Sequence, residues 1–204
     1  MPNRGDRGGA KTRARIAEVA TGLFLERGFD EVTIAEVAAA AGVSKVTVFS
    51  HFERKEDLLL DRLPEAIELV RSAVRERTGG VVDALRQLSL TLLEEAHVLS
   101  GVGGDIEPLM RTVAESPALI ARLRAFGYEM EAELAGELAA DARFTGDAAL
   151  VAALVVAAYR TVAVATVRRR LEGEDLAELA VSHRERLARA FDAVERLVGD
   201  SVSG

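Results

Sequence analysis

Several kinds of residue are scarce or missing in this chain. Its 204 residues include no cysteine and no tryptophan, and aromatic side chains make up only 4%. Without cysteine the chain can form no disulfide, thiolate nucleophile or cysteine-ligated zinc finger, and a reducing compartment is allowed. The longest uncharged run, from Ala148 to Tyr159, is too short to span a bilayer and indicates a buried helix. We therefore expect a cytoplasmic protein with no membrane partner.

Helix-forming residues dominate the rest of the composition. Hydrophobic residues make up 49% of the chain, and Ala, Leu, Val, Glu and Arg are the most frequent types. The 17 glycines and 4 prolines lie mainly in the N-terminal segment and at joints between periodic segments. This composition predicts an all-α protein of one or two small domains. The apolar periodicity divides the chain into about nine helices.

Charge is distributed unevenly along the chain. The net charge is −7, which by itself argues against a nucleic-acid partner. Up to residue 60, however, nine Lys/Arg balance nine Asp/Glu, and up to Arg27 six basic residues exceed three acidic ones. The acidic surplus therefore lies after residue 60, and the charge distribution permits DNA binding without proving it.

Residues 32–59 carry the clearest structural signal. Thr33 and Glu36 have the spacing of a capping box, which predicts a helix beginning at Thr33. Gly42 can supply the left-handed residue that ends this helix, and Ser44 can cap the next one. Two helices joined by so short a turn must pack together, which is typical of a helix-turn-helix.

The second of these short helices presents polar side chains. Ala38 lets the two backbones approach, while Val43 and Val48 fill the angle between the helices. Hydroxyl and amino groups on a helix in the major groove can reach base edges and phosphates. Such side chains also suit a solvated face, but the flanking packing pattern favours a DNA-binding module. They are Ser44, Lys45, Thr47, Ser50 and His51.

Residues 1–60 resemble the TetR family of transcriptional repressors. The stretches LFLERGFDEVTIAEVAAAAGVS and VFSHFERKEDLL carry the resemblance. It implies a homodimer that binds a palindromic double-stranded DNA operator and releases it when a small-molecule effector binds. It also implies that Thr33 and Lys55 hold phosphates at helix N-termini.

Two positions depart from the family pattern. Tyr is usual where this chain has Phe49, so one phosphate contact through a hydroxyl is lost. Val46 stands where Gly, Ala or Ser is common, and it could contact a thymine methyl group or only pack. The resemblance assigns the DNA-binding surface to Thr33, Ser44, Lys45, Val46, Thr47, Phe49, Ser50, His51 and Lys55.

We expect three regions along the chain. Residues 1–9 form a flexible basic tail, residues 10–54 the helix-turn-helix domain, and residues 55–204 a helical ligand-binding and dimerisation domain. The tail contains Arg4 and Arg7, and it is either solvated or an arm that contacts DNA. No apolar segment follows it, so it is not a signal peptide.

Joints between helices give two further expectations. The fourth helix should begin near Lys55 and contain Pro64, which should kink it. The kink would be either a hinge for the ligand signal or a fixed feature of the core. The glycine-rich residues 100–104 should form a flexible joint.

The resemblance places a ligand pocket among helices four to eight. The apolar and flexible side chains there, with few polar anchors, favour an apolar or amphipathic effector such as an acyl chain. The same residues at helical spacing also suit a plain core. The candidates are Leu92, His97, Met110, Phe126, Met130 and Tyr159.

The last helix carries a heptad-like stripe. Its members alternate at spacings of four and three residues, which predicts a helix–helix seam. With the apolar helix over 147–171, this helix could form half of a four-helix dimer interface or pack inside one subunit. The resemblance favours the dimer, and His183 is expected to be hydrogen-bonded. The seam comprises Leu176, Ala180, His183, Leu187, Ala190, Val194 and Leu197.

Patterns of other functions are incomplete. Glu94 and His97 have the E-x-x-H spacing of di-iron bundles, but the second copy that such a site needs is missing. The GVGGD at 101–105 lacks a following Lys-Ser/Thr and is not a phosphate-binding loop. No catalytic constellation assembles, and we expect neither metal nor cofactor. Two alternatives stay open: an interaction scaffold, and a helical enzyme or metal carrier without DNA binding.

Overall fold

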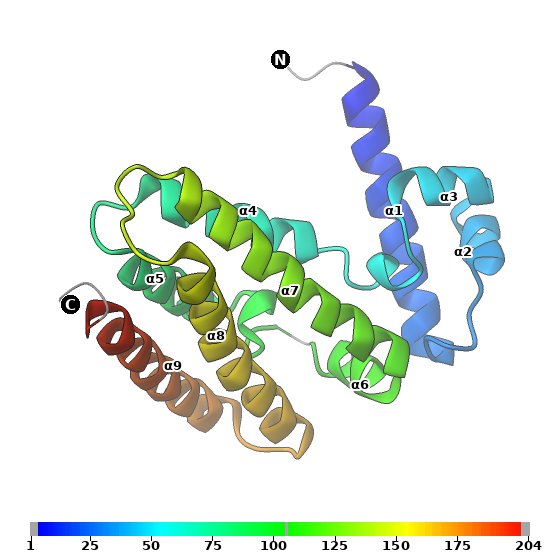
Figure 1. Cartoon of the computed structure of the whole chain (residues 1–204). Helices are drawn as coiled ribbons and strands as arrows, with labels where there is room; N and C mark the ends of the chain where they lie inside the picture. The colour runs from blue at the N-terminus through cyan, green and yellow to red at the C-terminus, as the bar shows by residue number, and fades with distance from the viewer. Residues whose placement is uncertain (1–3, 105, 201–204) are drawn as a thin grey trace. The chain divides into compact units, whose positions relative to one another are not determined.

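A computed structural model describes residues 4–104 and 106–200 (Figure 1). These residues form nine α-helices and two short 3-10 helices, without a strand among them. The α-helices are α1 Arg4–Arg27, α2 Ile34–Ala41, α3 Lys45–His51, α4 Leu63–Glu76, α5 Val81–Glu94, α6 Glu107–Glu115, α7 Pro117–Ala140, α8 Ala148–Leu171 and α9 Leu176–Asp200. The 3-10 helices are η1 Glu56–Leu58 and η2 Val98–Ser100. The predicted all-α class is confirmed.

The chain folds into two compact units. The first comprises the chain up to Leu63 together with Arg111–Arg122. The second comprises Pro64–Met110 and the chain from Leu123 onward. The helix-turn-helix thus shares its unit with the end of α6 and the start of α7.

Helix α1 supplies the centre of the first unit. Ile16, Ala20 and Phe24 recur at helical spacing and are fully buried. Phe29, in the turn after α1, packs against Phe24 with ring centroids 4.9 Å apart. The core therefore holds α2 and α3 against one long helix. Side chains from the segments after α1 complete it: Val37, Ala38, Ala41, Val48, Phe52 and Leu58.

Helix α1 is longer than the sequence predicts. It begins at Arg4, so most of the segment expected to be a flexible tail is helical. The Thr12 hydroxyl donates to the backbone oxygen of Gly8 at 3.0 Å, which links successive turns. Glycine lowers helix propensity, but it does not stop the extension of a helix that packing already stabilises. Residues 1–3 and the side chains of Arg4 and Arg7 lie outside the described part of the chain.

The segment between α3 and α4 differs from the prediction. Lys55 precedes the 3-10 helix η1, and α4 begins only at Leu63. Pro64 therefore lies in the first turn of α4, where an N–H has no acceptor within the helix and the fixed φ of proline is favourable. The predicted kink inside the fourth helix is wrong, and the hinge loses its physical basis.

Helices α4, α5, α7, α8 and α9 share the core of the second unit. Helix α9 packs along α8 and against α5 of the same chain. Helix α9 is therefore a core helix of its own subunit. The core side chains are Val74, Val81, Val82, Leu85, Leu134, Leu138, Val151, Ala152, Val155, Val162, Leu187, Phe191 and Val194.

Helix α8 buries one face and exposes another. Val151, Val155 and Val162 lie in the core, whereas Leu150 is 49% exposed and Val164 is 54% exposed. By length and composition alone α8 could cross a membrane, because the mean hydropathy of its most apolar window is 2.0. Of that window, 22% is buried within the chain. The core helix of a globular protein meets the same criteria. The expectation of a buried helix thus holds for one face of α8 in the single chain.

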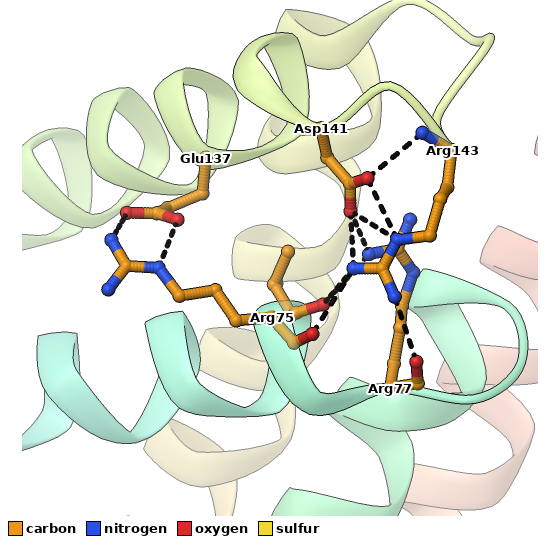
Figure 2. A network of polar contacts seen from close by, with 6 residues as sticks. Arg75, Arg77, Glu137, Asp141 and Arg143 are labelled. Carbon is orange, nitrogen blue, oxygen red and sulfur yellow. Dashed lines mark hydrogen bonds and ion pairs between the residues drawn. The ribbon is translucent and has the colours of Figure 1, made fainter.

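Arginines and carboxylates join the end of α4 to the end of α7 (Figure 2). Arg75 donates two hydrogen bonds to Glu137, at 2.9 and 2.6 Å, and Arg77 pairs with Asp141. Arg143 donates to Asp141 at 2.8 Å and to the backbone oxygen of Arg77 at 3.0 Å. Hydrogen bonds from Arg143 and Arg77 hold the pKa of Asp141 well below its usual range. The network thus satisfies carbonyl groups that the end of a helix leaves without partners.

Candidate nucleic-acid interface

Helix α2 begins with the capping box that the sequence predicts. The Thr33 hydroxyl accepts from the N–H of Glu36, and the Glu36 carboxylate accepts from the N–H of Thr33 at 2.8 Å. Arg27 donates to the same carboxylate at 2.7 Å. Hydrogen bonds from the Thr33 backbone and hydroxyl, with a further one from Arg27, lower the pKa of Glu36 to about 2. These contacts attach the start of α2 to the end of α1.

The turn between α2 and α3 sets the direction of α3. Gly42 has a φ of 66°, in the left-handed region, and its N–H donates back into the last turn of α2. The N–H of Val43 donates to the same turn at 2.9 Å. Ser44 then accepts from the N–H of Thr47 at 3.0 Å and caps α3. The predicted turn and cap are confirmed.

Helix α3 has a buried face and an exposed face. Val48 is fully buried, and Phe52, directly after the helix, is 3% exposed. Val46 is 78% exposed and Phe49 is 54% exposed, although both side chains are apolar. Exposed apolar side chains that lie together favour a surface that another molecule covers. We call this surface the α3 outer face; it comprises Lys45, Val46, Phe49 and Ser50.

The remaining polar residues of α3 already have neighbours. The hydroxyl oxygens of Ser44 and Thr47 lie 2.9 Å apart. Ser50 donates to the backbone oxygen of Thr47 at 2.8 Å, so it can accept a hydrogen bond from a base but cannot donate to a phosphate. The half-buried ring of His51 lies 4.0 Å from the ideal Cβ position of Gly9, near the start of α1.

The two predicted phosphate-binding residues have other contacts. The Lys55 ammonium donates to the backbone oxygen of Phe29 at 2.5 Å and lies 4.2 Å from the centroid of its ring. Because α4 begins later, Lys55 is the N-cap of the short 3-10 helix η1 and does not begin an α-helix. Its contact with a phosphate stays a prediction. The Thr33 hydroxyl donates to Glu36 at 2.8 Å, which leaves it no proton for a phosphate.

Basic side chains of α1 flank α3. The Arg13 guanidinium lies 4.2 Å from the centroid of the Phe52 ring. A guanidinium nitrogen of Arg15 lies 3.6 Å from the ideal Cβ position of Gly42. The sequence placed Arg13 and Arg15 in a basic segment without relating them to α3. Their position could not be predicted because it depends on how α1 packs against the two shorter helices.

The predicted ligand residues all belong to the second unit. The N–H of Leu99 donates to Nδ1 of His97 at 3.2 Å, and the Tyr159 hydroxyl donates to the backbone oxygen of Leu99 at 2.5 Å. Burial raises the pKa of Tyr159 to about 12. The two polar candidates are thus joined through one segment between α5 and α6. The apolar candidates are buried or half-buried: Leu92, Met110, Phe126 and Met130.

This connecting segment is not the flexible joint that the glycines of residues 100–104 suggested. Ser100 is 1% exposed, and its hydroxyl accepts from the N–H groups of Val102 and Gly103, both at 3.3 Å. A Cβ added at Gly103 would lie 1.7 Å from the backbone oxygen of Ala96. Buried hydrogen bonds and a close backbone approach therefore define the segment, and the expectation is wrong.

The predicted dimer seam divides into two groups. His183 and Leu187 are fully buried and Val194 is 4% exposed. These three residues do not form a dimer interface, because α5 and α8 of the same chain cover them. The expected hydrogen bond of His183 is confirmed, since its Nδ1 lies 2.8 Å from the Thr166 hydroxyl. The other seam residues are exposed or half-buried: Leu176, Ala180, Ala190 and Leu197.

The E-x-x-H pair has partners of another kind. Glu94 pairs with Arg184 at 2.9 Å, and Nε2 of His97 lies 3.3 Å from Glu65. Across residues 4–104 and 106–200, no group of three or more His, Asp or Glu side chains has the arrangement of a metal site. The spacing therefore carries no metal-binding assignment.

A curated relative and a family model match the chain in sequence. Residues 16–61 match the model of bacterial regulatory proteins of the tetR family. The chain is 30% identical over 135 residues to the HTH-type transcriptional regulator TcmR of Streptomyces glaucescens. That alignment covers 64% of this chain and 60% of the relative, so the chain matches less than two thirds of its length.

Solved structures share the fold. NalD, the secondary repressor of the MexAB-OprM multidrug efflux pump in Pseudomonas aeruginosa, aligns with a TM-score of 0.56 at 19% identity, over 89% of this chain and 97% of its own. The SmeT–triclosan complex aligns with a TM-score of 0.57 at 18% identity, over 92% of this chain and 91% of its own. These likenesses establish the fold. The sequence matches, which centre on residues 16–61, assign the helix-turn-helix of this chain to the TetR family of bacterial transcription regulators.

Proposed function

We propose that this chain is a DNA-binding transcriptional repressor whose helix α3 enters the major groove of its operator. The α3 outer face carries the proposal. Val46 and Phe49 can contact thymine methyl groups, and Lys45 can reach a base edge or a phosphate. Repression is supported by NalD, which is a repressor of the same fold. The family is one of transcription regulators, which disfavours the enzyme alternative.

The surroundings of α3 suit a DNA contact. Caps at Ser44 and Thr33 hold the helix-turn-helix in place, so little ordering entropy is lost on binding. Arg13 and Arg15 bring positive charge beside α3, where phosphates would lie. The acidic surplus of the chain begins only after residue 60. A repressor meets its operator in the cytoplasm, so the proposal implies an intracellular protein.

We propose that the chain acts as a homodimer through the outer faces of α8 and α9. Leu150 and Val164 on α8, and Val181 on α9, are 49%, 54% and 60% exposed in the single chain. A second copy that covered these aliphatic side chains would give the repressor two α3 helices, one for each half-site of a palindromic operator. Exposed or half-buried residues of α8 alternate at spacings of four and three along one stripe: Leu150, Leu154, Ala157, Thr161 and Val164.

The second unit is the proposed site of an apolar or amphipathic effector. SmeT, which has the same fold, is known in a complex with triclosan. In this chain, buried apolar residues of that unit surround a few hydrogen-bonded polar groups such as Tyr159. Effector binding would favour a conformation in which the separation of the two α3 helices no longer fits the operator.

Selection of bound DNA from a random pool tests the proposed function. The selected sequence should be palindromic, with half-sites about ten base pairs apart. In a gel-shift titration, Phe49→Ala should weaken binding to that sequence. Tyr128→Ala is the matched control, because Tyr128 is a 74% exposed aromatic residue on α7. A pool without enrichment, or equal affinity of Phe49→Ala and wild type, would contradict the proposal and favour the interaction scaffold.

A further inference from the structure

A buried arginine in the second unit has no acidic partner among the described residues. Arg170, in the last turn of α8, is 5% exposed. Its guanidinium donates to the backbone oxygens of Val102 and Gly104, each at 2.7 Å. Its Nε–H is enclosed and makes no hydrogen bond to the described part of the chain. A positive charge is thus buried against two neutral carbonyl groups.

Other enclosed arginines of this chain are neutralised. The Arg77 side chain is 5% exposed and pairs with Asp141. The Arg122 side chain is 12% exposed and lies 2.7 Å from Asp57. Charged side chains are almost never fully buried unless they are paired, because the loss of hydration is otherwise uncompensated. Arg170 therefore departs from the arrangement that Arg77 and Arg122 follow.

The two carbonyl groups belong to a segment with an unusual backbone. Ala96 has a φ of 50°, a left-handed conformation that is unfavourable for a residue with a side chain. Gly101 and Gly104 also have positive φ, at 74° and 67°. Glycine adopts positive φ without strain, but the conformation of Ala96 persists only where surrounding contacts hold it. The hydrogen bonds from Arg170 are therefore among the contacts that maintain the conformation of residues 96–104.

We propose that Arg170 binds the carboxylate of an acidic, amphipathic effector, which bonds the free Nε–H and takes the place of one of the two carbonyl oxygens. The inference rests on the proposed function and assigns the charge of its effector. A carboxylate matches the planar guanidinium through two parallel hydrogen bonds, one of them to the Nε–H. It also supplies the negative charge that the carbonyl groups lack. One guanidinium neutralises a singly charged carboxylate but not a doubly charged phosphate.

The face of α8 beside Arg170 suits the apolar part of such a molecule. Tyr159, Val162 and Thr166 precede Arg170 at spacings of three and four residues, so they share one face of the helix. Val162 and Thr166 are 3% and 1% exposed. The hydroxyls of Tyr159 and Thr166 are already hydrogen-bonded within the chain. The face therefore places buried, uncharged side chains without free hydrogen-bond donors beside the Arg170 cation.

Binding of a carboxylate to Arg170 would displace residues 96–104, the segment that precedes α6. Because the Nε–H is enclosed, a carboxylate can reach it only if the surrounding chain moves, and Val102 and Gly104 are bonded to the same guanidinium. Helix α6 follows directly, and its residues from Arg111 onward belong to the first unit. In that unit Arg122 at the start of α7 pairs with Asp57, which lies just after the helix-turn-helix. Displacement of the segment thus has a covalent route to the DNA-binding unit.

Matched acids and amides test the charge requirement. The probes are octanoate, decanoate, benzoate and phenylacetate, each beside its uncharged amide. Binding to the full chain is measured by calorimetry and by thermal unfolding, for wild type, Arg170→Gln and Arg169→Gln. Arg169 is the matched control, because it lies in the same turn and pairs with Glu174. At least one acid should bind wild type and Arg169→Gln at least about tenfold more tightly than its amide, and Arg170→Gln should lose that preference.

The outcomes separate this inference from the proposed function. Equal binding of acids and amides to wild type, no binding of any acid, or an acid preference retained by Arg170→Gln would each overturn it. If Arg170→Gln does not fold, Arg170→Lys replaces it; lysine keeps the charge but not the planar fork, so acids should bind more weakly. Operator binding by ligand-free wild type is measured separately. Its loss contradicts the proposed function, whereas failed acid binding with intact operator binding contradicts only this inference.

Discussion

Protonation of His183 should lower the stability of the fold below neutral pH. His183 is fully buried; its Nδ1 lies 2.8 Å from the Thr166 hydroxyl, and its Nε2 has no partner in the described part of the chain. Burial, with a smaller effect of the positive charge of Arg186, lowers the pKa of His183 from 6.5 to about 4. The imidazole is therefore neutral in the folded chain at neutral pH.

The size of the effect follows from the difference between the two pKa values. The unfolded chain takes up the proton around pH 6.5, whereas the folded chain takes it up only around pH 4. The unfolded state therefore binds more protons between these values, and the free energy of unfolding decreases as the pH falls. The contribution of His183 is complete only above about pH 7.5, and about 2 kcal/mol of it is lost between about pH 7.5 and about pH 5.

His183→Asn isolates this contribution. The carboxamide can replace Nδ1 as the partner of Thr166 but does not titrate. Urea unfolding of wild type and variant, at about pH 7.5 and about pH 5 and at one protomer concentration, gives the free energy of unfolding of each. Other titrating groups contribute equally to both proteins, so they cancel in the difference. Thr166→Val is the control that removes the hydrogen bond but keeps the imidazole, and it should retain the pH dependence. An equal loss of stability in wild type and His183→Asn would refute the reasoning.

Changes elsewhere separate folding, dimerisation and DNA binding. Leu187→Ala removes a fully buried side chain and should destabilise the fold by about 2–5 kcal/mol in urea unfolding. Val164→Glu, at an exposed position, should dissociate the proposed dimer in sedimentation without unfolding the chain, and an intact dimer would move the interface away from α8. Lys45→Ala should weaken operator binding by about 1–3 kcal/mol in gel-shift titrations, and unchanged affinity would remove Lys45 from the interface. Deletion of residues 1–9 should reduce the slope of log affinity against log salt, because fewer counterions are released. An unchanged slope would mean that Arg4 and Arg7 face solvent and do not contact DNA. Pro64→Ala should leave effector-driven release of the operator normal, because Pro64 lies in the first turn of α4 and does not kink the helix. Impaired release at equal operator affinity would instead support a hinge at Pro64.

Local signals in the sequence determined the helix-turn-helix. The capping box at Thr33, the left-handed Gly42 and the cap at Ser44 each act within a few residues of chain. The ends of α2 and α3 could therefore be predicted without knowledge of the rest of the fold. The apolar period likewise determined the all-α class. The contacts of the α3 outer face with DNA stay a prediction.

Only the tertiary structure decided which groups the individual residues contact. Lys55 seemed to begin a helix, but its ammonium binds the backbone oxygen of Phe29 from a distant part of the chain. Pro64 seemed to interrupt a helix, but η1 and the turn after it delay the start of α4 until Leu63. The contact of Lys55 has no local signature, because it depends on how α1 packs against the segment after α3. Proline favours both a first turn and a kink, so the sequence around Pro64 did not decide between them.

Burial was decided in the same way. The heptad stripe shows that one face of α9 is apolar, but not that α5 and α8 of the same chain cover Leu187 and Val194. Arg170 ends a run of three arginines that the sequence alone would leave in solvent, and it is enclosed with the segment that contains Val102. Periodicity sets the direction of a side chain relative to its own helix. Its surroundings, and the free energy of its burial, depend on segments far away in the sequence, which only the packed structure brings together.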